Sequence, residues 1–199
     1  MPVRTFGALW AQLPAELKLS IFHRLPLRDV IHFSYFSLQF RLFALHCLRH
    51  RLSDILTAYN LDVYSVFQSL DRCNTVIAGS TALEIVCPSS ITPNNLDFLC
   101  PITESNLFIS YLRHKEYCVM VDPTFGPPSI DEDPGQNSIR AVVTLLHPTT
   151  QTKIHVIVSS SSSALAPLFL SHSTFVMNFI SASAFYCCYP KLTANREGQ

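Results

Sequence analysis

The 199-residue chain is 48% apolar and 11% aromatic but only 14% charged. This balance excludes a disordered protein and favours a compact fold with a sizeable core. Its formal net charge is zero, so the composition does not predict a nucleic-acid-binding protein. The charge is uneven, because residues 1–60 hold seven Lys and Arg against three acids. The length suits one domain of ordinary size with a small second module.

Seven cysteines form an odd set, and neither a Cys-x-x-Cys pair nor a recognisable secretory signal accompanies them. This predicts reduced thiols in a cytoplasmic or nuclear protein. The adjacent Cys187 and Cys188 lack a second ligand pair nearby. Five histidines show no spacing that converges on one ion: His23, His32, His46, His114 and His172. We therefore expect no metal site and no cofactor.

Near the N-terminus, apolar residues repeat every four positions: Leu13, Leu17, Ile21 and Leu25. Pro14 suits a first helical turn, and Pro26 must end the helix because proline lacks the backbone N–H. We expect a helix of about three turns, then a short helix near Asp29 and a longer third one. Four phenylalanines continue the apolar face: Phe33, Phe36, Phe40 and Phe43. Four charged or polar residues of the third helix are expected to face solvent: Arg41, Arg49, His50 and Arg51.

This segment resembles an F-box. The likeness rests on these residues: Leu13, Pro14, Glu16, Leu17, Ile21, Phe22, Leu25, Pro26, Asp29, Val30, Phe33 and Ser34. The resemblance implies a helical module at residues 12–54 that binds the Skp adaptor of cullin-type ubiquitin ligases, while the attached domain chooses the substrate protein. The side chains that would contact the adaptor are Leu13, Pro14, Leu17, Ile21, Leu25 and Pro26. The alternative is an amphipathic helical hairpin that packs on its own domain, since apolar spacing does not separate the two.

A second pattern lies at residues 76–84. Residues 76–78 are a short apolar run that ends at Gly79, which predicts a buried strand, a tight turn and a helix start. Thr81 and Glu84 have the spacing of a capping box. Backbone N–H groups at such a turn suit an anion. Without further features, the pattern is also compatible with an ordinary strand, turn and helix.

Asn95 and Asp97 alternate on the next predicted strand, so both side chains leave by one face, near that turn. The arrangement resembles the nucleotidyltransferase fold of DNA polymerase beta and its relatives. The family's phosphate-binding turn falls on Gly79 and Ser80, and its three metal-binding acids fall on Asn95, Asp97 and His155. Only Asp97 is an acid, and two-metal chemistry needs several carboxylate ligands. The resemblance therefore implies a degenerate, catalytically inactive domain. The alternative is a metal-dependent nucleotidyltransferase, or a nucleotide-binding domain, that uses the Gly79–Ser80 turn and Asp97.

The predicted fold class is mixed α+β or α/β. It comprises the helical module at 12–54 and a nucleotidyltransferase-like domain at 55–199, with a sheet of about five strands and flanking helices. Asp62 is expected to cap a helix, and residues 139–146 and 153–158 to form a hairpin. Residues 154–190 carry no charged side chain, but Pro167 and several polar residues argue against a membrane span. A buried helix is expected there instead, bearing Phe175, Met177, Phe179 and Ile180.

The stretch from Ser159 onwards, with its phrases at residues 172–174, 176–180 and 189–193, also resembles a family of basidiomycete fungal proteins. These proteins share the Gly-Ser-Thr-Ala-Leu and Asn-Leu-Asp phrases at residues 79–83 and 95–97, and the resemblance covers most of residues 75–198. That likeness supports the scaffold and implies no activity. The sequence thus predicts an F-box-type adaptor rather than an enzyme. Its expected partners are a Skp adaptor and an unknown substrate protein, with neither nucleic acid nor membrane.

Overall fold

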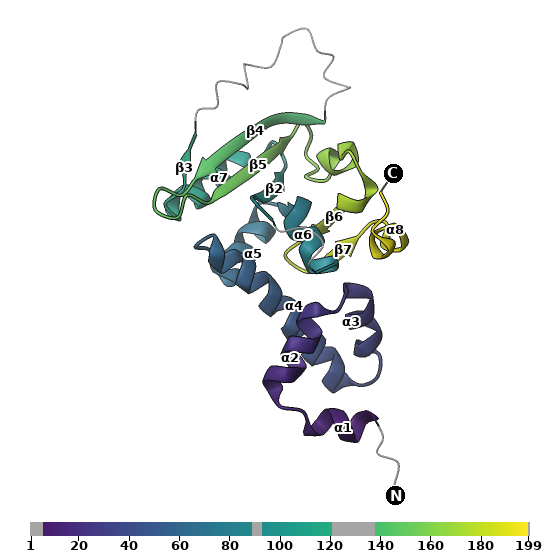
Figure 1. Ribbon diagram of the computed structural model, residues 1–199. Coiled ribbons are helices and arrows are strands. Elements are labelled where there is room, and N and C mark those ends of the chain that lie inside the picture. The colour runs from purple at the N-terminus through teal and green to yellow at the C-terminus, as the bar shows by residue number, and fades with distance from the viewer. Residues whose placement is uncertain (1–5, 89–92, 121–137, 199) are drawn as a thin grey trace, which may run out of the picture.

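A computed structural model describes residues 6–88, 93–120 and 138–198. These residues form a mixed α+β fold with eight α-helices and one open, mixed sheet of seven strands (Figure 1). The prediction of a mixed class is confirmed, but the prediction of about five strands is wrong by two. None of the helices in the described ranges has the length and apolar character needed to span a membrane.

Four helices form the N-terminal part: α1 (Phe6–Gln12), α2 (Ala15–Arg24), α3 (Leu27–Ser34) and α4 (Leu38–Ala58). Pro14 and Pro26 stand immediately before α2 and α3 with φ of −56°, the value that proline imposes and that a helix start tolerates. Ser37 caps α4, because its Oγ accepts a hydrogen bond of 3.3 Å from the backbone N of Phe40. The helix starts and stops predicted from the prolines are confirmed.

The four helices share an aromatic core. Phe22 is fully buried, and its ring centroid lies 5.2 Å from that of Phe33 and 5.0 Å from that of Phe43. Trp10 of α1 covers this group, 5.6 Å from Phe22. Phe36 was expected on the same apolar face but is 70% exposed, because it lies in the turn between α3 and α4.

Helix α4 joins the helical part to the sheet (Figure 1). It packs on α2 and α3 and also on α5 (Val63–Arg72) and α6 (Gly79–Val86). The predicted boundary between residues 54 and 55 falls inside this continuous helix.

The seven strands are β1 (Val76–Ala78), β2 (Leu96–Cys100), β3 (Cys118–Val119), β4 (Ile139–Leu146), β5 (Lys153–Ser159), β6 (Asn178–Ile180) and β7 (Phe185–Cys187). Their spatial order is β3-β4-β5-β2-β1-β6-β7, and β2 and β5 are parallel while the other neighbours are antiparallel. The remaining elements are α7 (Ser105–His114), α8 (Pro190–Asn195) and the short 3-10 helices η1 (Ala166–Leu170) and η2 (Thr174–Val176). The hairpin predicted at 139–146 and 153–158 is confirmed as β4 and β5.

The two strands missing from the prediction are β6 and β7. The expected buried helix around Phe175 and Ile180 is wrong, since only the single turn η2 forms before the chain enters β6. Asn178 Nδ2 donates a 2.7 Å hydrogen bond to the carbonyl of Phe175, which holds the turn between them. Ile180 then pairs with Ile77 of β1, and Phe179 stacks on Tyr186 of β7 with ring centroids 4.4 Å apart. Pairing at the edge of β1 therefore overrides the local helical pattern.

The two faces of the sheet are covered unequally. Ile77, Phe98 and Val156 point into the main core beneath the helices. Their neighbours in the strands alternate to the other face, where Ala78 and Leu99 belong to a smaller cluster with residues of the 164–177 segment. Asp97, two residues from Leu99, lies on this second, thinly covered face.

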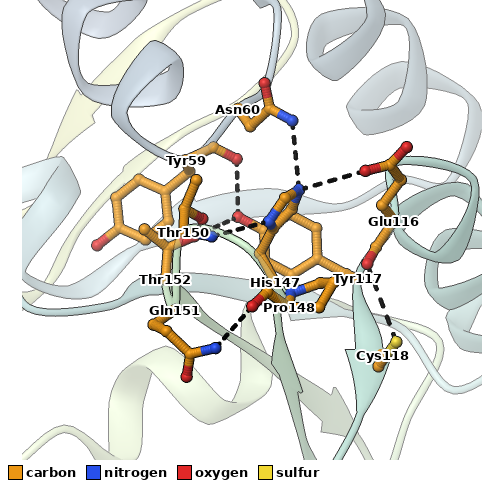
Figure 2. Close-up of polar contacts among 10 residues, drawn as sticks. All are labelled: Tyr59, Asn60, Glu116, Tyr117, Cys118, His147, Pro148, Thr150, Gln151 and Thr152. Atoms are coloured by element: carbon orange, nitrogen blue, oxygen red, sulfur yellow. Dashed lines mark hydrogen bonds and ion pairs between the residues drawn. The ribbon is translucent and has the colours of Figure 1, made fainter.

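The turn of the β4–β5 hairpin, residues 147–152, is tied to the α4–α5 connection by polar contacts (Figure 2). Tyr117 Oη donates a 2.7 Å hydrogen bond to the carbonyl of Tyr59 and lies 2.9 Å from Thr152 Oγ1. His147 is buried beside it. Its Nδ1 accepts a 3.3 Å bond from the backbone N of Thr150. These contacts fix the hairpin against the helices, which sets the position of β5 and of His155 within it.

Candidate functional site

The turn between β1 and α6 requires glycine. Gly79 has φ of +68°, a left-handed conformation that side chains with a Cβ rarely adopt. A Cβ placed on Gly79 would overlap Oδ2 of Asp97, so the carboxylate of β2 rests directly against this turn. The chain thus brings the predicted turn and the predicted acid into contact.

Asn95, Asp97 and His155 meet beside this turn. Asp97 and His155 are register partners on the parallel strands β2 and β5, and Asp97 Oδ1 lies 3.1 Å from His155 Nδ1. Asn95, immediately before β2, donates from Nδ2 to Asp97 Oδ1 and lies 3.0 Å from His155 Nδ1. The three residues to which the resemblance assigned metal-binding positions therefore form one hydrogen-bonded group.

This group offers one carboxylate, one amide and one imidazole. Of the two carboxylate oxygens of Asp97, Oδ1 is already engaged by Asn95 and His155. Two hard cations held side by side require several anionic oxygen ligands. Among the described residues, the sole cluster of three or more His, Cys, Asp or Glu groups with ligand-like spacing lies elsewhere, at His23, His50 and Asp54. The Asp97 group suits hydrogen bonding to a polar ligand better than two-metal chemistry.

A pocket of about 490 Å³ opens over the turn and Asp97. Gly79, Ser80 and Asp97 line it together with apolar residues, among them Ile157, Leu168 and Val176. His172 also lines it, but His155 does not. Asp97 is the single acid among the described lining residues. The volume falls in the range of small-molecule sites.

The predicted capping box at Thr81 and Glu84 does not form. Helix α6 begins at Gly79, and Ala78 precedes it without a side-chain cap. Thr81 is fully buried in the first turn, and its Oγ1 has no hydrogen-bond partner. The helix begins three residues earlier than a cap at Thr81 would place it, because the φ of Gly79 allows the chain to turn at once.

The six side chains predicted to contact an adaptor are partly exposed or exposed. Leu17 and Ile21 on α2 are 52% and 42% exposed. Pro14 is exposed and Leu13, Leu25 and Pro26 are half-buried. Phe22, next to Ile21, is the fully buried side chain on the opposite face of α2.

The predictions for Arg51 of α4 and His23 of α2 were wrong. Arg51 was expected in solvent but is 5% exposed. Its guanidinium donates to the carbonyls of Phe22, Leu25 (2.6 Å) and Ile85 (3.1 Å). His23 was not expected to lie near other potential metal ligands, yet it lies beside His50 and Asp54. The spacing of His50 and Asp54 by four residues was the available signal, but His23 is brought to them only by helix packing.

No family model, curated protein sequence or solved structure matches this chain.

Proposed function

We propose that the protein is an F-box-type adaptor. Its N-terminal helical module binds the Skp adaptor of a cullin-type ubiquitin ligase. Its second part, a catalytically inactive nucleotidyltransferase-like domain, recruits a substrate protein for ubiquitylation. The proposal rests on the F-box-like order of residues 13–34 and on the surface that the helical module presents.

The observation that carries the proposal is a set of exposed apolar side chains on α2, in the turn after α3 and at the start of α4. Leu17 and Ile21 of α2 are joined by Phe36, Leu38 and Leu42, which are 70%, 70% and 59% exposed. Several exposed apolar side chains within one small helical module are typical of an interaction surface. Helical faces with this spacing are typically covered by a partner's helix.

The proposed lack of catalysis rests on the composition of the Asp97 group. Asn95 and His155 stand where the resemblance places two metal-binding acids, and both are hydrogen-bonded to Asp97. A neutral amide and an imidazole do not supply the anionic oxygens that hold Mg²⁺ and stabilise a transferring phosphoryl group. The pocket would then serve recognition rather than reaction.

The test is a titration of the full chain with purified Skp adaptor. Leu17→Asp together with Ile21→Asp places two charges on the exposed face without touching buried Phe22. We expect affinity to fall by about a hundredfold or more, as for the loss of two central contacts. The control is Phe169→Asp, which puts the same charge on an apolar side chain of η1 that is 62% exposed. Binding that survives the double substitution would sink the proposal.

A second candidate function is nucleotide binding, with or without turnover. It is favoured by the pocket that opens over Gly79, Ser80 and Asp97, because a helix that begins in a glycine turn presents backbone N–H groups to a phosphate. Calorimetry with ATP and Mg²⁺, on the wild type and on Asp97→Asn, tests it. A substitution at Gly79 is unsuitable, since any Cβ there collides with Asp97. If the wild type releases pyrophosphate and Asp97→Asn does not, the domain is an enzyme, and the proposal that it is catalytically inactive is overturned.

A further inference from the structure

The C-terminal half of α2 and the middle of α4 bring together two imidazoles and a carboxylate. His23 comes from α2, and His50 and Asp54 come from α4. The geometry points to a binding site for a divalent transition-metal ion, Zn²⁺ in the first place, at His23, His50 and Asp54. This inference is independent of the adaptor function and of the pocket at Asp97.

The distances suit a shared ion. One ligand atom from each of the three residues lies within 4.8 Å of the others. His50 Nδ1 and Asp54 Oδ2 are 3.1 Å apart, close to the ligand-to-ligand separation of about 3.3 Å that tetrahedral bonds of about 2.0–2.1 Å to zinc require. The ring centroids of His23 and His50 are 5.1 Å apart with an interplanar angle of 80°, so the two imidazoles from different helices lie side by side.

The chemistry of the three groups also suits zinc. Imidazole nitrogens and a carboxylate oxygen are typical ligands of Zn²⁺, and three protein ligands leave one position for water. His50 and Asp54 are one helical turn apart on the same face of α4. Their side chains are 46% and 56% exposed, so an ion reaches the site from solvent without opening the core.

The surroundings do not block a cation. Arg51 and Glu84 line a hollow of about 180 Å³ together with His23 and Asp54. The positive charge of Arg51 is turned toward three backbone carbonyls, and Glu84 supplies an opposing charge.

A bound ion would tie α2 to α4. Apart from the carbonyl contacts of Arg51, these helices are held together mainly by apolar packing. An ion that binds only when His23 and Asp54 are adjacent stabilises the folded state, by an amount that grows with the logarithm of its concentration above the dissociation constant. We therefore expect Zn²⁺ to raise the midpoint of thermal unfolding.

The experiment is a titration of chelator-treated full-length protein with Zn²⁺ against a colorimetric chelator at pH 7.5, followed by thermal unfolding. We expect one tightly bound ion per chain. His23→Gln and Asp54→Asn should each weaken binding by about tenfold or more, since even residues that only support metal ligands cost that much. They should also remove the rise in midpoint caused by Zn²⁺.

Two further histidine variants test whether the ion is held by residues of both helices or by exposed residues of α4 alone. His114→Gln changes an exposed histidine at the end of α7 and should leave binding unchanged. His46 lies one turn before His50, with ring centroids 6.3 Å apart. If His46→Gln abolishes binding while His23→Gln does not, the ion is held by α4 alone and the inference is overturned. Equal binding by all variants overturns it as well. Unchanged melting of the metal-free variants shows that they are folded.

Discussion

At the scale of single residues, Tyr117 shows how a buried hydroxyl positions a strand. It is 1% exposed, and its Oη contacts both the carbonyl of Tyr59 and Thr152 Oγ1. Tyr117→Phe keeps the ring but leaves both partners without that hydrogen bond inside the protein. We expect a loss of about 1–2 kcal/mol in the free energy of unfolding, measured in urea. Tyr64→Phe, at a side chain 75% exposed, should change it by less than about 0.5 kcal/mol. Equal effects would contradict the described packing.

Two cysteines give a second prediction at this scale. Burial raises the pKa of Cys47 and of Cys100 to about 11. Nearby Arg51 partly offsets the effect at Cys47, and the hydrogen bond from Thr75 partly offsets it at Cys100. Alkylation requires the thiolate, so a short pulse of iodoacetamide at pH 8 should leave both unlabelled in the folded chain.

Exposed Cys118 provides the internal comparison for that pulse. Peptide mapping by mass spectrometry should find it labelled first, and unfolding in urea should make all three react. Labelling of Cys47 or Cys100 as fast as Cys118 in the folded protein would show that these thiols are not buried as described.

At the scale of elements, the start of α5 depends on Asp62. Its Oδ1 accepts a 2.8 Å hydrogen bond from the backbone N of Ser65, and Oδ2 lies 3.0 Å from Lys115 Nζ. Hydrogen bonds from Ser65 and then from Lys115 hold the pKa of Asp62 well below its ordinary value. Asp62→Ala should lower the free energy of unfolding by about 1 kcal/mol at pH 7, the usual worth of such a cap.

The effect of Asp62 should also depend on pH. Because the folded-state pKa is depressed, the stabilisation is complete above the unfolded carboxyl pKa of about 3.9 and is lost as pH falls toward the folded value. The difference between wild type and Asp62→Ala, measured by urea unfolding at pH 7 and at pH 3, should therefore shrink in acid. A difference that grows in acid would mean that the charged form of Asp62 is not the stabilising one.

The elements that could be predicted from sequence were those with a strong local cause. Pro14 and Pro26 set the start of α2 and α3 by removing a backbone donor, and Asp62 supplies a cap. The strands β6 and β7 have only three residues each, too few for alternation to show. Their cause is tertiary: Ile180 pairs with β1, a strand about a hundred residues earlier in the chain.

The candidate sites also divide into features with a local cause in the sequence and features that depend on tertiary packing. Alternation placed Asn95 and Asp97 on one face of a strand, and the resemblance added His155, so their proximity follows from sequence patterns. Nothing local indicated that Arg51 is buried, because its three acceptors lie in α2, in the residue after it and in α6. The periodicity of one segment does not reveal contacts that form only when separate helices pack together.

At the scale of the whole molecule, Arg51 links the helical module to the domain that carries the sheet. Lysine at this position keeps a charge but cannot reach three carbonyls with a planar fork. Arg51→Lys should lower the free energy of unfolding by about 2–3 kcal/mol, whereas Arg49→Lys at an exposed neighbour should have little effect.

The single tryptophan of the chain, Trp10, lies in the module and reports on it by fluorescence. In the wild type, fluorescence and circular dichroism should give one coincident urea transition, because α4 is shared by both parts. In Arg51→Lys the fluorescence transition should come first. Separate transitions in the wild type would show that the link through α4 and Arg51 does not couple the two parts.

The most direct test of the proposed adaptor function is hydrogen exchange of the full chain with and without purified Skp adaptor. We predict slower exchange in α2 (Ala15–Arg24) and in the first turns of α4, where Leu17, Ile21, Leu38 and Leu42 are exposed. Exchange in α5 should be unchanged. Protection confined to other elements, or no protection at adaptor concentrations that saturate known F-box modules, would contradict the account.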